Sequence, residues 1–268
     1  MIGAGVVTPF DPFAPGSITV LALLALRVGG LVLIAPVFSA KPLPAHLKAA
    51  LIVLFAVLLQ PAARASAVSG VSLTFASALG ETMTGFAIGL GAALLVGAAD
   101  AAGELIAIST GLSGAAILDP MSSIQGPALG QFTSFFAITL MLALDAHIVM
   151  LDAVATSTRV LPIGAPLDLA AGAFALVRTG SQLFGLGLRF AAPVVAVVLI
   201  ANVALAILSR AAPQLNILSV AFPLQICAGL VAFAATIPVI AMFFNGWTSF
   251  YEAVLTHSLG AFAVAGAR

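Results

Sequence analysis

Charged residues are scarce in this chain. Asp, Glu, Lys and Arg together make up 7% of its 268 residues, whereas hydrophobic residues make up 62%. Soluble domains carry roughly a quarter charged residues, because the surface that faces water must be polar. The composition therefore excludes a soluble globular protein and predicts an integral membrane protein.

Basic residues are no more numerous than acidic ones, and the formal net charge is zero. A nucleic-acid-binding protein would need a basic surface, which this balance does not supply. The single cysteine, Cys227, cannot form a disulfide within the chain and lies in an apolar stretch, where we expect a small buried hydrophobic residue. Residues 1–16 contain no Lys or Arg, so we expect no cleavable signal peptide.

The sequence lacks the common motifs of enzymes and metal sites. HExxH, GxSxG and P-loop sequences do not occur. Asp145, His147 and Asp152 lie close together in the sequence, but a zinc site needs three or four ligands at workable spacing and no fourth donor lies nearby. We therefore expect no enzyme activity, no cofactor and no bound metal.

What the chain does contain is a series of apolar segments. A membrane-spanning helix needs about 20 mostly apolar residues. The six candidates cover residues 17–36, 49–59, 71–99, 129–151, 169–208 and 217–244. The second is short. The fifth would reach about 60 Å as one helix, so we expect it to project beyond the bilayer or to bend near residues 185–189. The pattern predicts an all-α polytopic membrane protein with about six hydrophobic helices, some broken or kinked.

Several charged residues lie within or beside these segments: Arg27, Glu81, Glu104, Arg178 and Arg189. A charge at membrane depth costs at least a few kcal/mol unless it is paired or faces protein. The two glutamates could be the proton or ion sites of a transporter. Alternatively, they could pair with one of the three arginines inside a packed assembly. The sequence leaves both readings open.

Residues 100–119 form the most polar stretch, with acids at 100, 104 and 119 and glycines at 103, 111 and 114. Irregular backbone at membrane depth is stable only when it is buried in protein or lines an aqueous cavity. We therefore expect this stretch to depart from a lipid-facing helix.

Short motifs along the chain resemble, in their order, the FliR family of flagellar export-gate proteins, which is related to a subunit of virulence type III secretion systems. The C-terminal motifs are RFAAPV at 189–194, ILSRAAPQLN at 207–216 and AFPL at 221–224. The upstream motifs are RVGG at 27–30, APVFS at 35–39, GELI at 103–106, GLS at 111–113, DP at 119–120 and LPIG at 161–164. The ordered set covers nearly the whole chain and is specific.

The resemblance implies a non-enzymatic, pore-forming subunit of the flagellar type III export gate, in the bacterial inner membrane at the basal body. In that family one FliR joins several FliP and FliQ copies in a cone-like channel that passes unfolded flagellar subunits. FlhB and FlhA homologues are further implied partners, with membrane lipid and without nucleic acid. Residues 1–268 would form one membrane-embedded domain, in which 1–160 resemble FliP and 161–268 resemble FliQ.

The resemblance also implies a loop that plugs the pore. Its residues here are Ser109, Thr110, Gly111, Leu112, Ser113, Gly114, Ala115, Ala116, Ile117, Leu118 and Asp119. The family commonly has bulkier residues at some of these positions, so we expect a smaller plug. The candidates for buried charge or subunit packing are Arg27, Glu81, Glu104, Arg189, Arg210, Gln214 and Asn216.

Two other functions remain possible from the sequence. One is the corresponding gate subunit of a virulence type III system, which would share the architecture. The other is a proton-coupled transporter of small solutes, although the two related halves with matching broken helices that are usual in such transporters are not found here.

Overall fold

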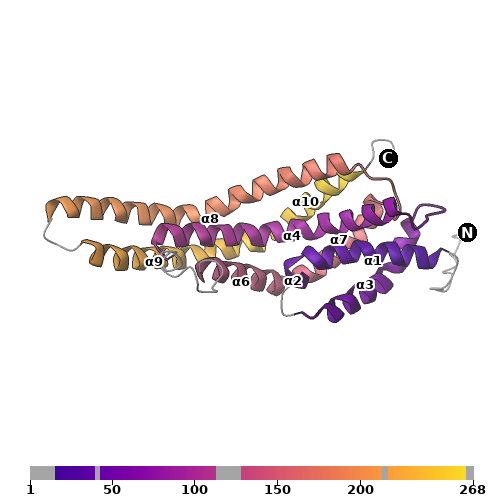
Figure 1. Ribbon diagram of the computed structural model, residues 1–268, viewed down its shortest axis with the longest axis horizontal. Coiled ribbons are helices and arrows are strands. Elements are labelled where there is room, and N and C mark those ends of the chain that lie inside the picture. Colours follow the sequence, from indigo (N-terminus) through magenta and orange to yellow (C-terminus); the bar gives the residue numbers. More distant parts are fainter. Residues whose placement is uncertain (1–15, 40–42, 113–127, 213–216, 264–268) are drawn as a thin grey trace, which may run out of the picture. The chain divides into compact units, whose positions relative to one another are not determined.

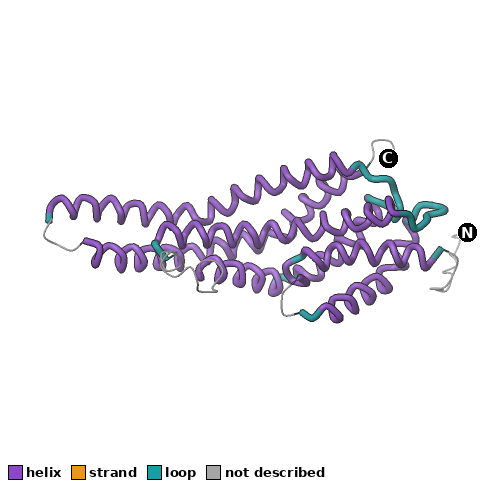
Figure 2. The backbone as a smooth tube through the Cα atoms, in the orientation of Figure 1, coloured by secondary structure: helices purple, strands orange, loops and turns teal. Residues whose placement is uncertain are grey.

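The computed structural model describes residues 16–39, 43–112, 128–212 and 217–263, and the regular structure in them is helical (Figure 2). The helices are α1 (Ser17–Ile34), α2 (Pro36–Ser39), α3 (Ala45–Ser66), α4 (Phe75–Thr110), α6 (Ala128–Ala143), α7 (Ala146–Val160), α8 (Leu169–Ala211), α9 (Ile217–Asn245) and α10 (Trp247–Phe262). Five described helices are long and apolar enough to cross a membrane, or six spans exist if the bent pair α6–α7 counts as one. The predicted all-α polytopic membrane fold is confirmed.

The chain forms two compact units. Unit 1 is drawn from Met1–Gly91, Ile148–Leu176 and Glu252–Arg268, and unit 2 from Ala92–His147 and Val177–Tyr251. In unit 1, α1 lies beside α3 (Figure 1). Leu23, Leu24, Val28 and Leu31 of α1 are fully buried. The first half of α4 approaches α1 closely, because glycines stand at the contact: a Cβ atom at Gly30 would lie 2.5 Å from the Thr82 carbonyl oxygen.

Unit 2 contains the second half of α4 together with α6, α9 and most of α8. α4 and α6 are close enough that a Cβ atom at Gly103 would lie 2.2 Å from Thr133 Oγ1. The rings of Phe132 in α6 and Phe233 in α9 meet edge to face, 6.0 Å apart. The side chains of Asn202 in α8 and Gln225 in α9 form a hydrogen bond between two neighbouring helices (Figure 1).

Three boundaries differ from those expected. α4 remains helical from residue 100 to Thr110, so the expected departure from helix over residues 100–119 is wrong for that part. The reason is that Gly103 serves the close contact with α6 rather than ending the helix. α3 begins at Ala45 and continues through Pro61 to Ser66, and is therefore longer than predicted. α8 is one helix of 43 residues that ends at Ala211 rather than at residue 208.

The predicted fourth segment is two helices. α6 ends at Ala143 and α7 begins at Ala146, and Asp145 between them has a φ of 55°. An aspartate tolerates this left-handed conformation better than most residues, which is why no glycine or proline marks the break. The helix α10 was not expected at all.

Candidate functional site: a buried ion pair and the loop between α7 and α8

The side chains of Arg27 and Glu81 form an ion pair inside unit 1. Arg27 lies in α1 and Glu81 in α4, and Nε of the arginine is 2.6 Å from Oε2 of the glutamate. Only 1% and 4% of the two side chains are exposed. The pair is one of the pairings that the sequence left open for Glu81.

The remaining polar atoms of the pair bind the end of α7 and the loop that follows it. Arg27 Nη1 donates to Ser157 Oγ at 3.0 Å, and Arg27 Nη2 donates to the Leu161 carbonyl at 3.0 Å. The backbone N–H of Gly164 donates to Glu81 Oε1 at 2.9 Å. One network therefore joins α1, α4, α7 and the loop at residues 161–168.

The loop is held on its other side as well. The N–H of Val68, between α3 and α4, donates to the Ile163 carbonyl at 3.2 Å. Gly164 has a φ of 80°, a conformation that glycine adopts without steric cost. A Cβ atom at Gly164 would lie 2.1 Å from a methyl carbon of Val71. Glycine is therefore the residue that this position requires.

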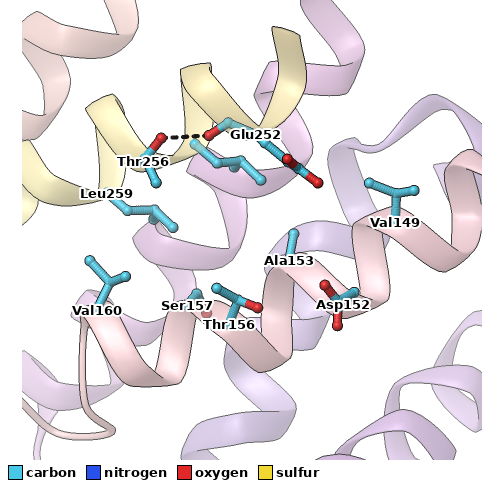
Figure 3. Close-up of a pocket in the computed structure, with 10 residues that line it drawn as sticks. Val149, Asp152, Ala153, Thr156, Ser157, Val160, Glu252, Thr256 and Leu259 are labelled. Atoms are coloured by element: carbon cyan, nitrogen blue, oxygen red, sulfur yellow. Dashed lines mark hydrogen bonds between the residues drawn. The ribbon is translucent and has the colours of Figure 1, made fainter. Parts of the chain in front are cut away.

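A small cleft of about 210 Å³ lies between α7 and α10, next to this network (Figure 3). Ser157 belongs to both, since it also lines the cleft. Its hydroxyl donates to the Val154 carbonyl at 2.7 Å and accepts from Arg27. Because both interactions are internal, the hydroxyl is not presented as a nucleophile. Asp152 and Glu252 lie on the two helices that form the cleft (Figure 3).

The other predicted residues lie apart from this network. Glu104 is exposed on α4, and Arg189 and Arg210 are exposed on α8. Within the first part of the expected plug, Ser109 and Thr110 form the last turn of α4 and both hydroxyls donate to the Ile106 carbonyl. The plug residues 113–119, and also Gln214 and Asn216, lie outside the described residues.

Asp145, His147 and Asp152 do not form a metal site. In the part of the chain that is described, no group of three or more His, Cys, Asp or Glu side chains could hold an ion. Asp145 and Asp152 are exposed. His147 Nδ1 is buried and has no hydrogen-bond partner among the described residues.

Sequence reasoning missed Ser157 and the loop contacts as parts of the site. Leu161 and Gly164 were visible as the ends of the LPIG motif. Ser157 had no such signal, because its partner Arg27 is 130 residues away.

Comparison with known proteins identifies the family. Residues 18–250 match the family described as "Bacterial export proteins, family 1". The chain is similar to the flagellar biosynthetic protein FliR of Escherichia coli (strain K12), with 34% identity over 81% of this chain and 84% of that protein. It is 32% identical to FliR of Pectobacterium carotovorum subsp. carotovorum over 81% and 84% of the two chains. It is 30% identical to FliR of Caulobacter vibrioides over 88% and 94%. The order of motifs, the helical fold and these matches agree: the chain belongs to the FliR family of flagellar biosynthetic proteins.

Proposed function

We propose that this chain is the FliR subunit of the flagellar type III export gate. It completes a channel with FliP and FliQ homologues in the bacterial inner membrane, and the channel passes unfolded flagellar subunits. FlhB and FlhA homologues act at the same gate. The observation that carries this proposal is the family match over residues 18–250 in a chain of long apolar helices.

The distribution of burial supports an assembly of several subunits. Within the most apolar windows, 61% of α4 is buried, but only 11% of α3 and 22% of α8. Lipid could cover an exposed surface that is purely apolar. α8, however, also exposes Arg178 and Arg189, and charges at membrane depth are stable when they face protein. We infer that neighbouring subunits cover part of this surface, and we assign Arg189, Arg210, Gln214 and Asn216 to subunit packing.

We further propose that residues 111–118 close the resting pore and that a translocating chain displaces them. Support comes from the point at which α4 ends. Gly111, directly after Thr110, has a φ of 79°, and a glycine in this conformation is a common helix terminator. The proposed plug therefore begins where the helix stops.

The division into a FliP-like part, residues 1–160, and a FliQ-like part, residues 161–268, is also a proposal. It falls at the loop that the ion pair holds. After that loop come the two neighbouring helices α8 and α9, joined by the Asn202–Gln225 hydrogen bond. Such a helical pair is suited to packing beside similar pairs of other subunits.

A transporter that moves protons through Glu81 is less consistent with the site. Both oxygens of that carboxylate are engaged, one by Arg27 and the other by the Gly164 N–H. A proton-carrying group must exchange its partners during each cycle, whereas these contacts join α1, α4 and the loop after α7. We therefore assign Glu81 to the architecture of the subunit rather than to ion movement.

Deletion of the gene tests the proposal. We expect the deletion strain to be non-motile, to secrete no hook or filament protein, and to recover when the gene is supplied on a plasmid. A strain that secretes flagellar proteins normally, but loses secretion through a virulence system, would contradict the flagellar assignment.

A further inference from the structure

A shallow groove of about 270 Å³ runs between α8 and α9 in unit 2. Its walls are mainly apolar and contain several small residues. The lining is Arg189, Phe190, Pro193 and Val197 from α8, with Ala232, Ala235, Thr236 and Val239 from α9. Small residues on a helix surface allow a further helix to approach closely. The groove is therefore suited to helix packing.

Arg189 is the only charged residue among the groove-lining residues. It is exposed, and it has neither an ion pair nor a hydrogen bond with any other side chain in the described part of the chain. The hydroxyl of Thr236 is already used, since it donates to the Ala232 carbonyl at 2.8 Å. The guanidinium thus lies at an apolar groove, and no described residue supplies a counter-charge.

Arg27 shows how this chain treats a similar arginine when it supplies the partner itself: the side chain is buried and paired with Glu81. Arg189 lies within the candidate span Ala170–Ala211. A guanidinium remains charged under all ordinary conditions. Because an unpaired charge beside apolar surface is costly, a counter-charge from outside the chain would stabilise this position.

We propose that the groove binds an apolar helix of a partner subunit, and that an Asp or Glu of that helix pairs with Arg189. This rests on the proposed function, and it adds the chemistry of the partner. An anionic lipid could also offer a negative charge. However, a lipid-facing arginine can extend to a phosphate from many positions, and this would not require small residues along two helices. The small apolar residues on both walls favour the helix.

Photo-cross-linking in intact cells tests the proposal. The photoreactive residue p-benzoylphenylalanine replaces Val239, which lines the groove and is 57% exposed. A matched control places it at Val231, also in α9 and 71% exposed but outside the groove lining. Each of the two probe positions is combined with the natural Arg189, with Arg189→Leu or with Arg189→Lys. Mass spectrometry identifies the cross-linked peptide, and the amount of extracted protein confirms folding of each variant.

We expect a protein adduct at Val239 whose peptide is apolar and contains Asp or Glu. Arg189→Leu should reduce this adduct about tenfold, which corresponds to about 1.4 kcal/mol, while Arg189→Lys should retain most of it. Arg178→Leu, which replaces an exposed arginine of α8 outside the groove lining, should leave the Val239 adduct unchanged. Any adduct of the Val231 probe should be unaffected by the substitutions at Arg189.

An adduct with phospholipid alone, no adduct, or an adduct unaffected by Arg189→Leu would overturn the proposal. So would an equal loss in Arg189→Lys, because packing rather than charge would then be responsible. The identity of the partner tests the proposed function separately. An apolar helix that contains Asp or Glu, but comes from a protein unrelated to FliP, FliQ or FlhB, would support the proposed binding in the groove and contradict the export-gate assignment.

Discussion

The backbone of Gly85 in α4 lies directly against the backbone of Arg27 in α1. A Cβ atom at Gly85 would be 1.9 Å from the Arg27 carbonyl oxygen. Gly85 is one helical turn after Glu81, so the same face of α4 supplies both the close approach and the carboxylate. The short distance between the helices and the ion pair are therefore parts of one contact.

Gly85→Ala should destabilise the protein by about 1–3 kcal/mol, because a backbone oxygen cannot move aside as a flexible side chain would. Gly97→Ala is the matched control in the same helix, since a Cβ atom there would meet no atom of the described residues within 4 Å. The control should be neutral or stabilising by up to about 1 kcal/mol, because alanine favours helix over glycine. Thermal unfolding in mild detergent measures both. Equal stability of the two variants would contradict the close contact.

Glu81→Leu should destabilise the protein by about 3–5 kcal/mol, since it leaves the buried charge of Arg27 uncompensated. The double variant Arg27→Met with Glu81→Leu should be more stable than either single change, because it removes both charges. Unfolding measurements on the unaltered protein, the two single variants and the double variant give the coupling free energy between the two side chains. Simple additivity of the two single effects would show that the charges do not interact in the membrane.

Gly164→Ala tests the loop between α7 and α8. The substitution combines a left-handed backbone conformation with a clash against Val71. Gly70→Ala is the control, since Gly70 has a similar φ of 74° but a Cβ atom there would have no neighbour within 4 Å in the described part of the chain. We expect the control to lose about 1–2 kcal/mol from backbone strain alone and Gly164→Ala to lose clearly more. A smaller loss at Gly164 than at Gly70 would contradict the tight loop.

A bulky residue at Gly111 or Gly114 should alter the proposed plug. We expect export of flagellar proteins to fall or the ion leak of the cells to rise, because the segment would no longer fit the closed pore. Secretion assays and an ion-sensitive dye measure these effects. Normal export together with normal ion tightness in both variants would rule out a plug at these positions.

The fold class could be predicted because apolar segments of membrane length dominate the sequence. The helix α10 was missed because Glu252, Thr256 and His257 interrupt its apolar residues. Its buried residues nevertheless recur at helical spacing, as Trp247, Tyr251, Leu255 and Leu259 show. A search for amphipathic helices would have found it, whereas a search for continuous apolar runs could not.

The candidate site was only partly visible in the sequence. The cost of burying a charge singled out Arg27 and Glu81, but it did not decide between Arg27, Arg178 and Arg189 as the partner. That choice depends on which helices pack together. Gly85 makes α1 the close neighbour of α4, and only the three-dimensional arrangement reveals this.

The proposed function requires that this chain works inside a channel built with FliP and FliQ homologues. To test this assembly, the chain is tagged at its own locus and extracted in mild detergent, and its native size and its partners are determined by mass spectrometry. We expect one large complex that contains FliP and FliQ homologues and becomes less stable when Arg210 is replaced by alanine. A lone monomer or a homodimer in the unaltered strain would rule out the proposed function.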